Sequence, residues 1–175
     1  MKKIIAMFIA CMVLSGCTAS SDRKNSDGSI SYEVTKYAKT AEYSDENTDI
    51  KLELPQNWEY STLPADENNS ELGGMEIKPS DDEDFSVRIK SRSNPVGICT
   101  TGVTVSDMNF NDNLSAKVYY EEFQDSKSIW LMFVFDGTDG KITAECTSSH
   151  TLMEKYRNEL TDIFKTMEII NKNWI

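Results

Sequence analysis

Apolar and polar residues alternate with a period of two along much of the chain from Asp49 onward. This pattern is typical of β-strands with one buried face. The clearest run covers residues 49–54 and ends at Pro55. Further runs are centred on Trp58 and Tyr60, Met75 and Ile77, Phe85 to Ile89, Val103 and Val105, Leu114 to Tyr120, and Ile142 to Cys146. We therefore expect an antiparallel sheet of several strands.

Residues 129–135 differ from these runs because every position in them is apolar (IWLMFVF). Such a run predicts a central strand that is covered on both faces. A strong turn signal, DGTDG, follows at residues 136–140. The pattern does not say what covers the second face, and residues 61–74 and the segment before Asp49 are both candidates.

After Cys146 the period changes to three and four residues, from Leu152 to Met167. This spacing predicts an amphipathic helix. Thr151 and Glu154 fit a capping box at its start, and Ser148 or Ser149 would cap the helix one turn earlier. Residues 167–170 can return as a last short strand.

The first sixteen residues have the layout of a secretory signal, with Lys2 and Lys3 before an apolar run over residues 4–14. That run is too short to span a bilayer comfortably. It is followed by Leu14-Ser15-Gly16-Cys17, which resembles the lipobox of bacterial lipoproteins. The resemblance implies that residues 1–16 are removed and that Cys17 becomes a lipid anchor carrying two or three acyl chains, enough for stable membrane attachment. The alternatives are a plain signal anchor, or secretion with Cys17 unmodified.

Residues 17–48 are interpreted as a flexible tether, and residues 49–175 as one extracytoplasmic domain. The stretch SSDRKNSDGSIS over residues 20–31 is too polar to form a core. A few apolar residues interrupt this polar pattern. They could form a short segment that packs on the domain, or they could belong to a linker, and the linker is favoured. These residues are Tyr32, Val34, Tyr37, Ala38 and Tyr43.

The chain of 175 residues has 18 Lys and Arg against 29 Asp and Glu, for a net charge of −11. Loss of Lys2 and Lys3 with the signal leaves 16 basic residues against the same 29 acidic ones, a net charge of −13. This balance argues against a nucleic-acid partner, because no excess of basic residues is available to neutralise phosphates. It also predicts that the domain stands away from an anionic membrane surface.

A first strand followed by Pro55-Gln56-Asn57-Trp58, then meandering strands, a late helix and a short last strand, resembles PsbP-like domains over about residues 49–170. The resemblance implies an α+β fold, in which an antiparallel β-sheet is flanked by helices and the C-terminal amphipathic helix packs on the sheet. Members of that family bind other proteins or assist assemblies. They share no catalytic constellation that could be transferred to this sequence.

Two cysteines, Cys99 and Cys146, remain once Cys11 leaves with the signal and Cys17 is acylated. An even pair in an exported protein predicts a Cys99–Cys146 disulfide. The alternative is two buried free thiols.

The other candidate groups have plainer interpretations. His150, the single histidine, lies at the expected helix start without a nucleophile motif, which favours a solvated surface residue over catalysis. The carboxylates of Asp81, Asp82, Glu83 and Asp84 lack EF-hand spacing, which favours a solvated turn over a cation site. Trp130 is expected in the core. Aromatic residues on an exposed sheet face would instead form a platform for a glycan or a protein; the other aromatics considered are Trp58, Tyr60, Tyr119 and Trp174.

These observations predict a non-enzymatic lipoprotein, attached to the membrane through Cys17 and facing the extracytoplasmic side. Its domain would bind a protein or another envelope component, or assist a membrane complex, without cofactor or metal. The alternative function is binding of a small ligand or glycan, or less readily hydrolysis, in a cleft or on an aromatic face of the sheet.

Overall fold

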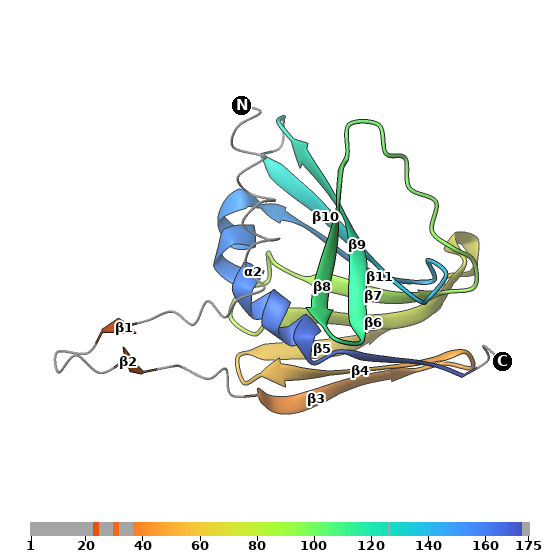
Figure 1. Ribbon diagram of the computed structural model, residues 1–175, viewed down its shortest axis with the longest axis horizontal. Helices are drawn as coiled ribbons and strands as arrows, with labels where there is room; N and C mark the ends of the chain where they lie inside the picture. Colours follow the sequence, from red (N-terminus) through yellow and green to blue (C-terminus); the bar gives the residue numbers. More distant parts are fainter. Residues whose placement is uncertain (1–22, 25–29, 32–36, 126, 173–175) are drawn as a thin grey trace. The chain divides into compact units, whose positions relative to one another are not determined.

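The computed structural model describes residues 23–24, 30–31, 37–125 and 127–172 (Figure 1). The chain divides into two compact units, residues 1–36 and residues 37–175. In the first unit, β1 (Arg23–Lys24) and β2 (Ile30–Ser31) pair antiparallel. All other described elements belong to the second unit.

The second unit contains a seven-stranded sheet in which every neighbouring pair is antiparallel, in the order β5-β6-β7-β11-β10-β9-β8. Its strands are β5 (Trp58–Leu63), β6 (Glu71–Pro79), β7 (Val87–Arg92), β8 (Thr104–Asn111), β9 (Leu114–Phe123), β10 (Ser128–Phe135) and β11 (Ile142–Ser149). A short 3₁₀-helix, η1 (Glu67–Asn69), connects β5 to β6. Most of the strands predicted from the period of two are thus confirmed, including β10 in the interior of the sheet. Phe85 lies before the start of β7, and residues 49–54 belong to a second sheet.

A smaller sheet contains β3 (Tyr37–Ser44), β4 (Thr48–Pro55) and β12 (Glu168–Asn171), in the order β12-β4-β3. β12 is the predicted last strand. β3 lies within the segment interpreted as a tether, so the structure differs there from the sequence interpretation. Tyr43 is buried, and its single hydroxyl proton is shared between the carbonyl oxygen of Leu72 (3.0 Å) and the carboxylate of Asp45 (3.1 Å). The compact unit therefore begins at Tyr37 rather than at Asp49.

The predicted amphipathic helix is α2 (His150–Lys165), and Ser149 caps it by accepting a hydrogen bond from the amide of Leu152 at 3.3 Å. The helix contacts β4 of the smaller sheet and β8, β10 and β11 of the larger one (Figure 1). Its buried side chains are Met153, Tyr156, Leu160, Ile163 and Phe164.

Two aromatic clusters form much of the core around this helix. The first joins β5 to α2 through Trp58, Phe85 and Tyr156, and the Trp58 indole N–H donates to Glu159 at 2.6 Å. The second surrounds Phe164 of α2 with rings from β8 and β10, whose centroids lie 5.1 to 5.7 Å from its own: Phe110, Phe133 and Phe135.

The expected α+β sandwich with flanking helices, as in PsbP-like domains, is wrong. The described residues form mainly antiparallel β-sheet and contain a single α-helix. Helical periodicity occurs only near the C-terminus, so only one face of the large sheet receives a helix. Residues 61–74, one candidate cover for the other face, form parts of β5, η1 and β6 instead.

Candidate functional site

β10 presents two different faces. Leu131 and Phe133 are buried toward α2, and the ring of Phe133 lies against Phe164 of that helix. Because side chains alternate along a strand, Trp130 and Met132 project to the opposite face. We call this opposite face of the seven-stranded sheet the outer face.

The loop between β7 and β8, residues 93–103, passes over the outer face. It is held at one end by the amide of Val96, which donates to the carbonyl oxygen of Gly140 at 2.9 Å. The amide of Arg92, just before the loop, likewise donates to Lys141 at 2.9 Å. The second cover of β10 is therefore an irregular loop, which the hydrophobic pattern did not identify.

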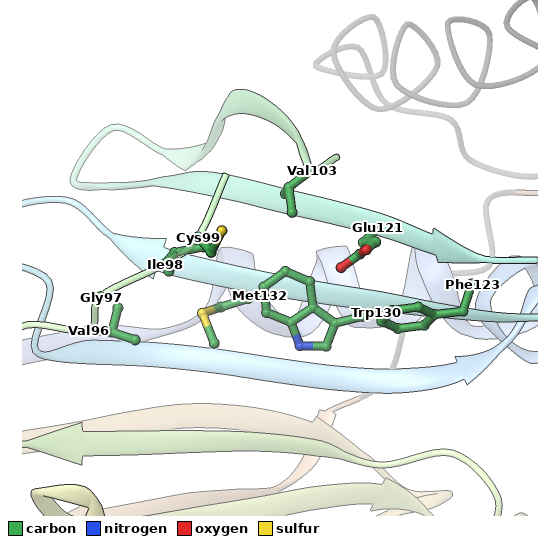
Figure 2. A pocket seen from close by; sticks show the side chains of 9 residues that line it. All are labelled: Val96, Gly97, Ile98, Cys99, Val103, Glu121, Phe123, Trp130 and Met132. Carbon is green, nitrogen blue, oxygen red and sulfur yellow. The ribbon is translucent and has the colours of Figure 1, made fainter. Parts of the chain in front are cut away.

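A cavity of about 270 Å³ lies where this loop meets β9 and β10 (Figure 2). Its lining is mostly apolar, with one carboxylate and one thiol among the side chains. The lining residues are Val96, Gly97, Ile98, Cys99, Val103, Glu121, Phe123, Trp130 and Met132. Phe123 remains 39% exposed, so the apolar surface continues beyond the cavity.

Two carboxylates flank the indole of Trp130. Glu145 on β11 accepts a hydrogen bond from the indole nitrogen at 2.7 Å, which fixes the orientation of the ring. Glu121 on β9 lies directly opposite Trp130 in the strand register, and both side chains face the cavity (Figure 2). Within the described part of the chain, Glu121 has neither a hydrogen-bond nor an ion-pair partner. It is the carboxylate that this cavity offers to a ligand.

The structure places the two candidate disulfide cysteines on different faces of the sheet. Cys146 lies opposite Leu131 in the register and is buried on the α2 side, whereas Cys99 is exposed and lines the outer-face cavity. Both thiols are free. The structure therefore gives no support to the predicted Cys99–Cys146 disulfide, which would have to pass through the sheet.

The environments of the two thiols also differ. Hydrogen bonds from Thr101, first from its backbone and then from its side chain, hold the pKa of the Cys99 thiol below its usual value. Burial raises the pKa of the Cys146 thiol to about 12, with a smaller contribution from Glu145. The thiolate is the reactive form, so the folded protein should have one reactive and one inert thiol in this domain.

Alkylation of the folded protein with iodoacetamide should therefore modify Cys99 and leave Cys146 unmodified until denaturant is added. Because its pKa is lowered, Cys99 should react faster below pH 8 than the cysteine of an unstructured peptide. Peptide mass spectrometry after labelling at several pH values measures both effects. Recovery of a Cys99–Cys146 disulfide peptide from the protein, isolated with its thiols blocked, would contradict this prediction.

The other residues considered as candidates for catalysis or metal binding have structural contacts. His150, the first residue of α2, lies 3.1 Å from Glu122 at the surface, outside the lining of the cavity. Asp82 accepts hydrogen bonds from Tyr156 (3.1 Å) and Lys155 (3.3 Å), so the acidic turn is attached to the helix. In the part of the chain that the structure describes, no group of three or more His, Cys, Asp or Glu residues is arranged to hold a metal.

The structure corrects the expected position of one aromatic residue, Trp130. Trp130, expected in the core, is half-buried on the outer face, because the apolar run of β10 faces the loop on that side. Tyr119 lies opposite Met132 and shares this face, whereas Trp58 is fully buried. Trp174 and the predicted lipid anchor Cys17 lie outside the described residues.

A second, more polar cleft of about 710 Å³ lies between the β8–β9 turn, the β10–β11 turn and the segment that follows α2. Several of its polar side chains bind neighbouring parts of the chain. Asn111, for example, donates to the carbonyl oxygen of Lys165 at 2.9 Å, and Asp136 accepts from Ser115 at 2.5 Å. The outer-face cavity, with its free carboxylate, is the better candidate site.

The sequence matches no model of a known protein family and no curated protein. Among the described residues, no helix is both long and apolar enough to cross a membrane.

Proposed function

We propose that the protein is a membrane-anchored extracytoplasmic lipoprotein whose domain binds another protein without catalysing a reaction. The anchor part of the proposal is supported by the sequence Leu14 to Cys17 behind an apolar run, as described above. Cys17 would hold the protein at the membrane, and the domain beginning at Tyr37 would meet the partner.

The observation that carries the binding part is the apolar surface at one end of the outer face. Phe123 on β9, which lines the cavity, is 39% exposed. Val105 on the edge strand β8 is 44% exposed and lies two residues after Val103, which also lines the cavity. Contiguous apolar surface of this kind is typical of interaction sites. We call Val105 and the cavity lining together the outer-face patch.

Charge favours a basic partner. With residues 1–16 removed, 16 basic residues stand against 29 acidic ones, a net charge of −13. Glu121, which has no partner among the described residues, adds a carboxylate to the patch itself. Opposite potentials steer association and determine which partners bind. A partner with basic and apolar side chains together fits this surface.

The polar groups around the cavity do not favour catalysis. A cysteine nucleophile works with a base that is within hydrogen-bond reach. The histidine of this chain, His150, is paired with Glu122 and does not line the cavity with Cys99. The alternative function, binding of a compact small ligand, is favoured by the existence of a cavity beside Trp130.

The proposal is tested by photo-cross-linking in the native cells with the full chain. Benzoylphenylalanine is placed at Val105 on β8 or, as the matched control, at Tyr60 on β5, the opposite edge strand of the same sheet. The two positions are similarly exposed, at 44% and 41%. We expect a discrete protein adduct with a basic partner from position 105 and little or none from position 60.

A third variant adds Cys17→Ser to the probe at position 105. Without acyl chains it should leave the membrane fraction, because the proposal assigns membrane attachment to those chains and not to a protein segment. Equal adduct yields at positions 105 and 60 would overturn the binding proposal. Unchanged sedimentation of the Cys17→Ser variant with membranes would overturn the anchor.

A further inference from the structure

We propose that the outer-face cavity receives a positively charged side chain, lysine or arginine, of the bound protein. This inference rests on the proposed function and specifies the chemistry of its recognition. The juxtaposition of Glu121 with the ring of Trp130, inside an otherwise apolar cavity, carries it (Figure 2).

Glu121 differs from the other carboxylates of the outer face. Acidic side chains elsewhere on this face are already neutralised by basic neighbours: Glu76 by Arg88 at 3.0 Å, Glu71 by Lys90 at 2.8 Å, and Asp107 by Lys117 at 3.1 Å. Glu145 is engaged by the Trp130 indole. Of these carboxylates, only Glu121 lines the cavity, and it has no partner among the described residues. An incoming cation would therefore complete its pairing.

The walls of the cavity suit the rest of a basic side chain. The aromatic faces of Trp130 and Phe123 attract cations, and Trp is the most favourable ring for this interaction. The long methylene stems of Lys and Arg pack well against apolar groups while the charge is kept at a polar end. Val96, Ile98 and Met132 provide such apolar contact in the same cavity.

The size of the cavity favours a side chain over a larger free ligand. Its volume of about 270 Å³ is below the range of roughly 300 to 1,000 Å³ that is usual for small-molecule sites. The exposed side chain of Val105 beside it would remain without a role if a compact free cation were the ligand. A protein segment that inserts one basic side chain covers both the cavity and its apolar rim.

Cys99 provides a reporter inside the cavity, because its exposed thiol is part of the lining. The full chain is treated with two methanethiosulfonate reagents of similar size, one with a trimethylammonium group and one with a sulfonate group. The rate at which each reagent modifies Cys99 is measured by peptide mass spectrometry. It is then divided by the rate at which the same reagent modifies a small free thiol in solution. We expect the cationic reagent to be favoured by on the order of tenfold, and less at high salt.

Glu121→Gln should remove most of this preference. The matched control is Glu122→Gln, which deletes the same charge at the next residue of β9, on the other face of the strand and paired with His150. We expect the control to keep the preference. Equal preference in the Glu121→Gln and Glu122→Gln variants would overturn the proposed role of Glu121.

The two sources of a cation are separated by protection of Cys99. The probes are a short peptide with one lysine between leucines, the same peptide with glutamine in place of lysine, and tetramethylammonium. The proposal is supported if the lysine peptide slows modification of Cys99 and the glutamine peptide and tetramethylammonium do not. Protection by tetramethylammonium but not by the lysine peptide would overturn it in favour of a free cation. If position 105 still cross-links fully in the Glu121→Gln variant, the cation inference fails while the protein-binding function remains.

Discussion

Replacing Phe164 by alanine is expected to lower the free energy of unfolding by about 3 to 5 kcal/mol. Phe164 is fully buried on α2, and its ring is in edge-to-face contact with three other aromatic rings from β8 and β10. Its removal leaves a cavity at the point where the helix meets the large sheet. Because small domains are stable by only about 5 to 15 kcal/mol, this is a large fraction of the total.

The matched control for this prediction is Phe123→Ala. It makes the same chemical change at a position that is 39% exposed, so it should cost less than about 1 kcal/mol. Urea unfolding of both variants, followed by tryptophan fluorescence, compares the two losses. Similar midpoints for the two variants would mean that α2 does not pack on the large sheet through Phe164.

Much of the β-structure and the helix could be predicted because their side-chain periods are strict. Residues 49–54 alternate without exception, and α2 has apolar residues at three- and four-residue steps. β3 was not recognised as a strand, because its buried residues are few. Of its eight positions only Ala41 and Tyr43 are buried, and the rest of the strand is as polar as a linker.

The candidate site was only partly accessible to sequence reasoning. The alternation in β9 already places Tyr119 and Glu121 on the face opposite Val118, so the outer-face position of Glu121 could have been read from the pattern. The loop over residues 93–103 has no period, and its position depends on tertiary contacts such as Val96 with Gly140. Without that loop, the apolar side chain of Trp130 suggested a core position rather than the wall of a cavity.

The fold expected from the resemblance to PsbP-like domains was wrong for a related reason. A motif such as Pro55 to Trp58 describes one turn, and here it places Trp58 at the start of β5, where it packs against Tyr156 of α2. It contains no information about what covers the far side of the sheet. In this chain that role belongs to an irregular loop and to rows of ion pairs, such as Arg88 with Glu76, which need no second helix.

Gly74→Ala is expected to destabilise the protein by about 3 kcal/mol or more, because β6 and β7 approach each other too closely there for a side chain. Gly74 is opposite Lys90 of β7 in the register, and a Cβ atom at Gly74 would overlap the backbone carbonyl oxygen of Ile89. Backbone atoms cannot move aside as a flexible side chain can, so the pairing of the two strands must change.

The control is Gly97→Ala, in the loop over the outer face, where an added Cβ would meet no described atom within 4 Å. This variant should unfold at nearly the wild-type urea concentration, whereas Gly74→Ala should unfold well below it or fail to accumulate. Hydrogen exchange adds a local test, because loss of the β6–β7 pairing should expose amides of β7 before those of β9. Since β7 joins the β5–β6 pair to β11, equal exchange in both strands would show that the close contact at Gly74 does not hold the two parts of the sheet together.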